Sequence, residues 1–436
     1  MSVCLKRRVF SMSSTVRRIS EKNVASKVSG EIEQKYFPAR LKIQISYHNG
    51  DHEMSEEDLN AIGRFRWQRP PSPYESFIEE ENIPIIRGLG VYDVRELALG
   101  PWQRMGGMGA YLELDGLQNR NALYVVEIPP RGALNAEKHM YEEVCCVVEG
   151  RGSTEVWRDG EPEKKQLFEW QKGSLFSPPL NSWHRLVNAT SSPARLVVGT
   201  NAPPIMAMFK SRKFIFDNPF QFDDRYPNDD DYFRPAEELS IRPENGRHIN
   251  LGNLIPDTLN CELPLENHRG AGHRNFAWRL SGNCFIGFVA QYPPGRYSKA
   301  HFHPGGPALV CLRGKGYLIT WPREVGVRPW ESGNGHLVKR QDYGECGIVS
   351  AAPGNGDWYH AHFGISKEPL RVMAFLGGYP RNLVGAPGDQ TSFNLDQKKG
   401  GNSIEYRDED PQIRKDYREA LEKNGAEFQM PETVYL

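Results

Sequence analysis

The sequence has no long apolar run, no closely spaced cysteine pair and almost no net charge, and each absence excludes a class of protein. No apolar stretch approaches the ~20 residues of a membrane-spanning helix. The 54 basic and 55 acidic residues give a net charge of −1, so no global charge attracts nucleic acid or an anionic membrane. The seven cysteines are an odd set without a Cys-x-x-Cys motif, which argues against a disulfide framework and favours a reducing compartment.

The first 20 residues are basic and rich in serine, and no acidic residue precedes Glu21. Mitochondrial presequences and disordered basic arms share this composition, so both interpretations stay open. We therefore expect a cytoplasmic protein, with a mitochondrial location as the alternative.

Two regions of the chain consist of short apolar runs rich in β-branched and aromatic residues, with Gly and Pro between them. The pattern predicts an all-β fold of sandwich or barrel type. Pro- and Asp-rich segments separate the two regions and indicate connections rather than core. The predicted division is an N-terminal arm (1–98), a first barrel (99–205), a linker (206–275), a second barrel (276–385) and a tail with one short solvated helix (386–436).

The two predicted barrels carry the same framework of residues, which indicates a duplicated unit. Aligning His303 with His139 places four further pairs in register: His301 with Glu137, Pro307 with Glu143, Gly314 with Gly150, and Trp321 with Trp157. A later block repeats as well, since Gly173, Pro179, His184, Asn188 and Pro193 match Gly347, Pro353, His360, Gly364 and Pro369.

The second copy offers three histidines as metal ligands. Residues i and i+2 of a strand point to the same face, so His301 and His303 can direct two imidazoles into one barrel interior. His360, on a later strand, is the expected third ligand. Imidazole suits Fe, Mn, Zn, Ni or Cu, so the residues alone do not select the metal.

The first copy offers His139, Glu143 and His184, a set of two histidines and one carboxylate that is typical of oxygen-using mononuclear iron. Glu137 stands where the second copy has His301, and is a candidate fourth ligand or nearby acid. In the alternative, this barrel holds no metal and the two glutamates pair with Arg131 or Lys138.

These residues resemble the cupin superfamily, and specifically its two-barrel (bicupin) members. The first cupin motif reads G-x5-H-x-H-x3,4-E-x6-G. The second copy matches it at Gly295, His301, His303 and Gly314, with Pro307 in place of its glutamate. The first copy matches it at His139, Glu143 and Gly150, with Glu137 in place of its first histidine. The resemblance covers about residues 100–205 and 276–385. It implies two tandem jelly-roll barrels of the double-stranded β-helix type, and the arms suggest a homo-oligomer by analogy.

Loss of the glutamate with retention of three histidines resembles the gentisate and salicylate 1,2-dioxygenases, as does the sequence Trp358-Tyr-His-Ala-His362. That resemblance implies Fe(II), with Mn, Zn or Ni as alternatives, and a small-molecule substrate that binds beside O2. The chain departs from those enzymes in one respect, because its three histidines lie in the second barrel instead of the first.

Two arginines, Arg371 and Arg279, are candidate clamps for a substrate carboxylate. We expect Tyr359 and His362 to face away from the metal. His362 is still a candidate base, one that would act on the substrate or the metal ligands through an intervening group. Three functions stay open. They are an Fe(II) dioxygenase acting on a hydroxylated aromatic or a hydroxy- or keto-acid, a Mn- or Zn-dependent decarboxylase, isomerase or lyase, and a non-catalytic storage or sensor protein.

Overall fold

The computed structural model describes residues 70–118, 120–243, 246–303, 307–353, 358–377 and 395–436. The chain separates into a unit of residues 1–68 and a unit of residues 69–436, and all of the described residues belong to the second unit. The basic residues 1–20 lie outside the described residues. None of the helices among the described residues combines the length and the apolar character that a membrane span requires.

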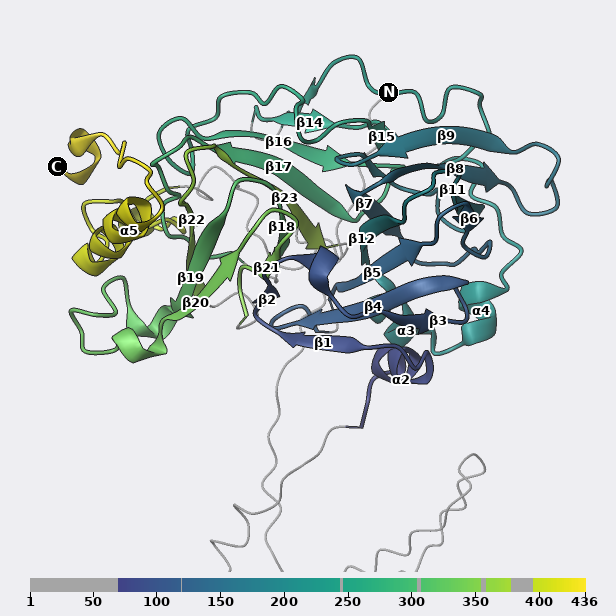
Figure 1. Ribbon diagram of the computed structural model, residues 1–436, viewed down its shortest axis with the longest axis horizontal. Helices are drawn as coiled ribbons and strands as arrows, with labels where there is room; N and C mark the ends of the chain where they lie inside the picture. The colour runs from purple at the N-terminus through teal and green to yellow at the C-terminus, as the bar shows by residue number, and fades with distance from the viewer. Residues whose placement is uncertain (1–69, 119, 244–245, 304–306, 354–357, 378–394) are drawn as a thin grey trace, which may run out of the picture. The chain divides into compact units, whose positions relative to one another are not determined.

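Two sheets form the first barrel (Figure 1). The larger sheet has the strand order β1-β4-β5-β12-β7-β10-β15, with β3 on β4, and the smaller has the order β6-β11-β8-β9. The bounds are β1 Ile85–Gly88, β3 Gly100–Trp102, β4 Gly107–Leu114, β5 Ala122–Ile128, β6 Gly132–Ala133, β7 Glu143–Glu149, β8 Arg151–Trp157, β9 Gln166–Gln171, β10 Leu175–Phe176, β11 Trp183–Asn188, β12 Ala194–Thr200 and β15 Leu254–Ile255.

The second barrel repeats this plan with a sheet of order β13-β14-β16-β17-β23-β18-β21-β2 and another of order β20-β19-β22. The bounds are β2 Gly90–Val91, β13 Ser240–Ile241, β14 His248–Asn250, β16 Arg274–Arg279, β17 Ile286–Tyr292, β18 Ala308–Arg313, β19 Gly316–Pro322, β20 Lys339–Tyr343, β21 Ile348–Ser350, β22 Trp358–Gly364 and β23 Leu370–Gly377.

The strand order confirms the predicted all-β fold of two tandem barrels with the same topology. The order β4-β5-β12-β7-β10 of the first barrel corresponds to β16-β17-β23-β18-β21 of the second, and β11-β8-β9 corresponds to β22-β19-β20. The aligned glycines Gly150 and Gly314 occupy the same tight turn, with φ of 80° and 82°. Glycine is favoured there because the left-handed region is costly for residues with a Cβ.

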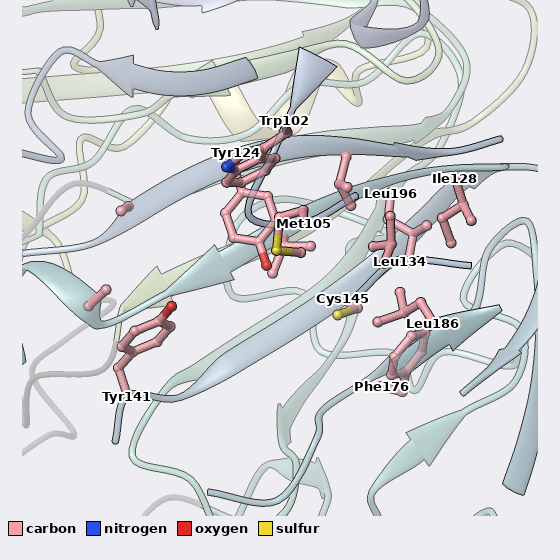
Figure 2. Close-up of a cluster of buried hydrophobic side chains, with 14 of the residues drawn as sticks. Trp102, Met105, Tyr124, Ile128, Leu134, Tyr141, Cys145, Phe176, Leu186 and Leu196 are labelled. Carbon is pink, nitrogen blue, oxygen red and sulfur yellow. The ribbon is translucent and has the colours of Figure 1, made fainter. Parts of the chain in front are cut away.

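Both faces of the large sheets are buried, which explains why their strands are continuously apolar. In β5, Tyr124 and Val126 belong to the core inside the first barrel, whereas Leu123 and Val125 belong to a second core. Figure 2 shows the first of these clusters, with Trp102 and Tyr124 among its labelled rings.

The second core lies between the barrels, because it combines residues of β5, β7 and β12 with residues of β16, β17, β18 and β23. Gly199 of β12 and Phe375 of β23 show how closely the two sheets approach. A Cβ at Gly199 would come within 2.6 Å of Phe375 Cδ1, so the aromatic ring occupies the space that a side chain would need.

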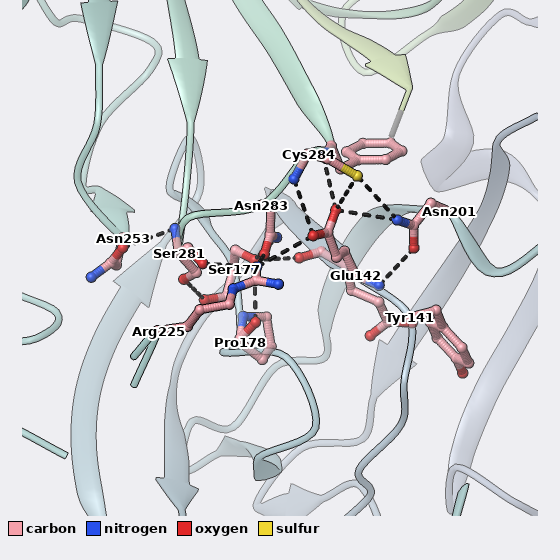
Figure 3. Close-up of polar contacts among 12 residues, drawn as sticks. Tyr141, Glu142, Ser177, Pro178, Asn201, Arg225, Asn253, Ser281, Asn283 and Cys284 are labelled. Carbon is pink, nitrogen blue, oxygen red and sulfur yellow. Dashed lines mark hydrogen bonds and ion pairs between the residues drawn. The ribbon is translucent and has the colours of Figure 1, made fainter. Parts of the chain in front are cut away.

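A buried polar network around Glu142 also joins the barrels (Figure 3). Its carboxylate accepts hydrogen bonds from the backbone N–H groups of Cys284 (3.0 Å) and Phe285 (2.8 Å) in the second barrel. The Arg225 guanidinium lies 3.3 Å from the same carboxylate, and the Asn201 amide donates to it at 3.2 Å. The charge is therefore balanced, as a buried carboxylate requires.

The predicted arm and linker contribute strands to both barrels. The strand β2, which precedes the first barrel in sequence, pairs with β21 of the second. The linker strand β15 pairs with β10 of the first barrel, while β14 of the same linker pairs with β16. The boundaries at residues 98 and 206 therefore do not coincide with the ends of the sheets.

Helices cover parts of the barrels. The helices α2 (Pro73–Glu80), α3 (Ala202–Phe209) and α4 (Arg212–Phe216) contribute buried residues to the core of the first barrel. The helix predicted in the tail forms as α5 (Pro411–Lys423), with the Asp410 carboxylate capping its N-terminus. It is not solvated all round, because Ile413, Tyr417 and Leu421 pack into the core around β19 and β22. Short 3-10 turns occur at Val94–Glu96, Arg323–Val325, Gly335–Leu337, Gln397–Lys399 and Glu432–Tyr435.

Candidate metal centres

Each barrel gathers one cluster of potential metal ligands. The nitrogen and oxygen atoms that could bind a metal lie within 4.8 Å of one another in each cluster. The first cluster contains Glu137, His139, Glu143 and His184, and the second contains His301, His303 and His360. The structure thus brings together every residue that the sequence predicts as a metal ligand.

The backbone places equivalent residues of the two clusters in the same way. In the first barrel, Glu137 and His184 exchange two backbone hydrogen bonds of 3.0 and 2.9 Å. In the second barrel, His301 and His360 exchange two bonds of the same lengths, 3.0 and 2.9 Å. This isolated bridge holds the start of the His-x-His segment against the strand that carries the last histidine.

The first cluster converges on the carboxylate of Glu143. Its Oε2 atom lies 3.3 Å from His139 Nε2 and 3.9 Å from His184 Nε2, and Glu137 Oε1 lies 3.8 Å from His184 Nε2. The phenol of Tyr124 donates a hydrogen bond of 2.9 Å to the other oxygen of Glu143. One carboxylate oxygen therefore stays directed at the two imidazoles.

Backbone carbonyl groups orient the rings of the first cluster. His139 Nδ1 lies 2.8 Å from the carbonyl oxygen of Tyr141, and His184 Nδ1 lies 3.2 Å from that of Ser182. A carbonyl oxygen only accepts, so each Nδ1 carries the proton and each Nε2 keeps a lone pair for a metal ion.

The charge balance of the first cluster also suits a cation. Burial acts to raise the pKa of Glu143, but the adjacent His139, together with His184 and Tyr124, outweighs this effect and the pKa is lowered. Burial likewise acts to lower the pKa of His139, and Glu143 outweighs it, so that pKa is raised. The pair attracts positive charge, whether a proton or a metal ion, and the donor set fits Mn, Fe or Zn.

Glu137 does not pair with either of the cations expected from the sequence. Its Oε2 atom forms an ion pair with Arg104, whose Nε also lies 2.9 Å from Glu81 Oε2. Lys138 pairs with Asp159 instead, at 2.6 Å. The prediction failed because neighbours in sequence point to opposite sides of an extended segment, and Arg104 approaches from another part of the fold.

The second cluster consists of imidazoles alone. The ring centroids are 4.3 Å apart for His301 and His360, 4.6 Å for His303 and His360, and 5.6 Å for His301 and His303. His301 Nδ1 lies 2.8 Å from the carbonyl oxygen of Lys299, which leaves its Nε2 for a metal. Burial lowers the pKa of His301 well below its usual value, and Arg269 lowers it further. A neutral imidazole is the form that binds metal.

The second barrel has lost both members of a hydrogen-bonded pair, not only its glutamate. The register places Tyr124 opposite Val198 in the first barrel and Phe288 opposite Ala374 in the second, which makes Phe288 the counterpart of Tyr124. Pro307 is the counterpart of Glu143. The loss of the carboxylate together with its phenol donor means that no buried hydroxyl is left without its acceptor at this position.

A segment of the C-terminal tail lies along the ligand-bearing residues of the second barrel. The Phe302 N–H donates to the Asn402 carbonyl (3.1 Å), and the Ile404 N–H donates to the Ala300 carbonyl (2.8 Å). Ser403 bridges to His301 as on a neighbouring strand. The tail therefore fixes the backbone from which two of the three imidazoles project.

The candidate carboxylate clamps lie away from the second cluster. Arg371 has the same orientation on β23 as Met373, which packs between the barrels, and its guanidinium donates to Cys261 O and Sγ. Arg279 is exposed at the end of β16. Neither position supports the clamp role that the sequence suggested, because the alternation of strand side chains turns Arg371 outward.

The expectation that His362 faces away from the cluster is wrong. Residues 360 and 362 are two apart in β22 and share a face, and their ring centroids are 5.6 Å apart. Burial and Arg269 lower the pKa of His362 to about 3, so its ring is neutral. Tyr359 does face away, and packs with Trp321 in the core beneath the tail helix.

Three residues near the clusters were missed in the sequence, namely Arg104, Tyr124 and Arg269. Arg104 reaches the first cluster from the turn between β3 and β4, and Tyr124 reaches it from β5. Arg269 reaches the second cluster from the linker. None belongs to a repeated motif. The only available signal was the presence of a tyrosine at 124 against a phenylalanine at 288, and that comparison requires the strand register.

Comparison with known proteins supports the fold of the first barrel. A family model described as a cupin domain matches residues 124–199, which run from β5 to β12. No curated protein sequence matches the chain.

Solved structures with some similarity include two variants of oxalate decarboxylase from Bacillus subtilis, each 12% identical with a TM-score of 0.42, over 67% of this chain and 78% of theirs. A third structure of that enzyme, at pH 4.6, is 12% identical with a TM-score of 0.41, over 67% of this chain and 77% of its own. Similarity at this level carries no argument about chemistry. The resemblance to the ring-cleaving dioxygenases stays a prediction.

Proposed function

We propose that this protein is a metal-dependent enzyme whose active centre is the three-histidine cluster of the second barrel. The observation that carries the proposal is that three buried imidazoles converge there without a carboxylate among the ligand atoms of the described residues. A divalent ion held by three neutral ligands keeps its full positive charge, and it therefore favours an anionic, chelating substrate. The proposed substrate class is a small hydroxylated aromatic acid or a hydroxy- or keto-acid.

The first barrel has a different proposed role. Its cluster supplies two carboxylates of its own, so a divalent ion bound there would be neutralised by the protein. Arg104 and Tyr124 hold the two carboxylates in place. We assign to this centre a metal that stabilises the barrel, and to the second centre the chemistry.

The first candidate reaction is redox-neutral: a decarboxylation, isomerisation or elimination supported by Mn or Zn. A bound ion would polarise the substrate oxygens and stabilise the negative charge that develops on them. His362 favours this candidate, since it places a neutral imidazole outside the ligand cluster on the same face as His360. Its N–H group can donate a hydrogen bond to the negative charge that develops on the substrate.

The second candidate is a dioxygenase that contains Fe(II) and consumes O2. The all-imidazole ligand set favours it, because three protein ligands leave coordination positions for a bidentate substrate and for a small molecule beside it. The two candidates differ in the metal required and in whether O2 is consumed.

Metal analysis of protein purified without chelators, combined with O2 uptake on a panel of hydroxy-, keto- and hydroxybenzoic acids, separates these functions. We expect His303→Ala to lose the metal of the second centre and all turnover. His139→Ala should lose the metal of the first centre but retain turnover. His336→Ala is the matched control, because this histidine is exposed. Full metal content in His303→Ala would refute the proposal, and turnover without O2 uptake would exclude the dioxygenase.

A further inference from the structure

Arg269 is a cation beside the second centre that the protein itself does not neutralise. Among the described residues it forms no ion pair, and its one side-chain hydrogen bond is from Nη1 to Ser403 Oγ at 3.2 Å. The arginine near the first centre, Arg104, is instead paired with two glutamates. Burial lowers the pKa of Arg269 to about 9, which means that its charge is poorly compensated yet present at neutral pH.

The guanidinium of Arg269 lies beside the ligand segment of the second barrel, because it donates to Ser403 Oγ and Ser403 bridges to His301 through the backbone. The charge of Arg269 lowers the pKa values of His301 and His362, which lie on two different segments of that barrel. The backbone fixes this placement, since the Arg269 carbonyl accepts a hydrogen bond of 2.9 Å from the N–H of Lys299, two residues before His301.

The tail supplies the other support. Ser403, which is fully buried, bridges to His301 through the backbone and accepts the hydrogen bond from Arg269 through its hydroxyl. One residue therefore fixes both the ligand segment and the guanidinium. A guanidinium has five N–H donors, and Ser403 uses one of them, so donors remain for an anion.

We infer that Arg269 binds the carboxylate of the substrate while the substrate's other oxygens meet the metal of the second centre. The inference rests on the proposed function and adds to it the residue that selects acids over neutral molecules. A planar guanidinium suits this task because it offers two parallel N–H donors to the two oxygens of a carboxylate. Arg371 and Arg279 are excluded by their positions on β23 and β16.

The test uses the full chain with His139→Ala, so that Co(II) added to the protein occupies the second centre alone. Glycolate, a hydroxy-acid, and imidazole, a neutral ligand, are titrated while the visible absorption of Co(II) is recorded. Arg269→Met should raise the Kd of glycolate at least about ten-fold, the scale of a lost charge-assisted hydrogen bond, and should leave the Kd of imidazole unchanged. Arg269→Lys should be intermediate, and Arg279→Met, the matched control, should not change either Kd.

Three results would overturn the assignment. The first is an unchanged Kd of glycolate in Arg269→Met. The second is a rise in both Kd values together. The third is loss of Co(II) from both Arg269→Met and Arg269→Lys, which would make Arg269 a support of the ligand segment. Failure of the proposed function would give a different result. The His139→Ala protein with Arg269 intact would then show no Co(II) absorption, because the second barrel would hold no metal centre.

Discussion

The buried carboxyl group of Glu409 should make the stability of the second barrel depend on pH. Glu409 is 5% exposed and accepts a hydrogen bond from the phenol of Tyr297, whose oxygen also lies 3.0 Å from that of Tyr435. Burial raises the pKa of Glu409 from 4.5 to about 8. The folded protein therefore holds a proton between these pH values that the unfolded chain releases.

The sign follows from proton linkage. Because the pKa is higher in the folded state, the stabilising contribution is complete below about pH 4.5 and is lost as the pH rises through about 8. At 1.36 kcal/mol per pH unit, the interval between 4.5 and about 8 corresponds to at most about 5 kcal/mol. The free energy of unfolding should fall by up to this amount across the interval.

The assay is thermal unfolding of metal-free wild type and Glu409→Gln between pH 5 and 9. The glutamine cannot ionise, so the variant should match the wild type at pH 5 and should have the higher Tm at pH 9. Glu405→Gln is the control, since Glu405 pairs with Lys299 near the surface. A difference in Tm between wild type and Glu409→Gln that stays constant across this range would refute the reasoning.

Three further predictions concern the two centres and the contact between the barrels. Tyr124→Phe removes the donor to Glu143 and should weaken metal binding in the first barrel about ten-fold, with no change in the second barrel; isothermal titration with Mn(II) measures both sites. Asn402→Ala removes the 2.6 Å hydrogen bond from the amide to the Phe302 carbonyl, and should lower the metal content of the second barrel alone, as counted by elemental analysis. Glu142→Ala leaves buried donors without their acceptor and should cost about 3–5 kcal/mol of stability, measured by denaturant unfolding.

The duplication could be predicted from sequence because equivalent residues keep equivalent spacing. Gly150 and Gly314 mark the same turn. Gly150 follows Glu143 by seven positions, and Gly314 follows Pro307 by the same number. Hydrophobic periodicity and turn signals are local properties, so they appear in one sequence without an alignment. The candidate ligands followed from the same spacing.

The surroundings of the second centre could not be predicted, because they come from segments distant in sequence. Arg269 lies in the linker and Ser403 in the tail, 134 residues apart in the sequence, and no local pattern marks either. The orientation of His362 toward the cluster could have been predicted, since His360 and His362 are two residues apart in a strand and therefore share a face. Arg371 was predicted to bind a substrate carboxylate because of its guanidinium. Its orientation on β23 directs the side chain away from the second centre and excludes that role.

The exchange of edge strands between the barrels means that the duplicated unit is not the unit that folds. Cutting the chain between residues 205 and 206 would leave the N-terminal piece without β15 and the C-terminal piece without β2, although each piece contains a complete set of candidate ligands. Each piece would expose an unpaired strand edge that its missing partner fits. The two halves, produced separately, should therefore aggregate when alone and reassemble when mixed.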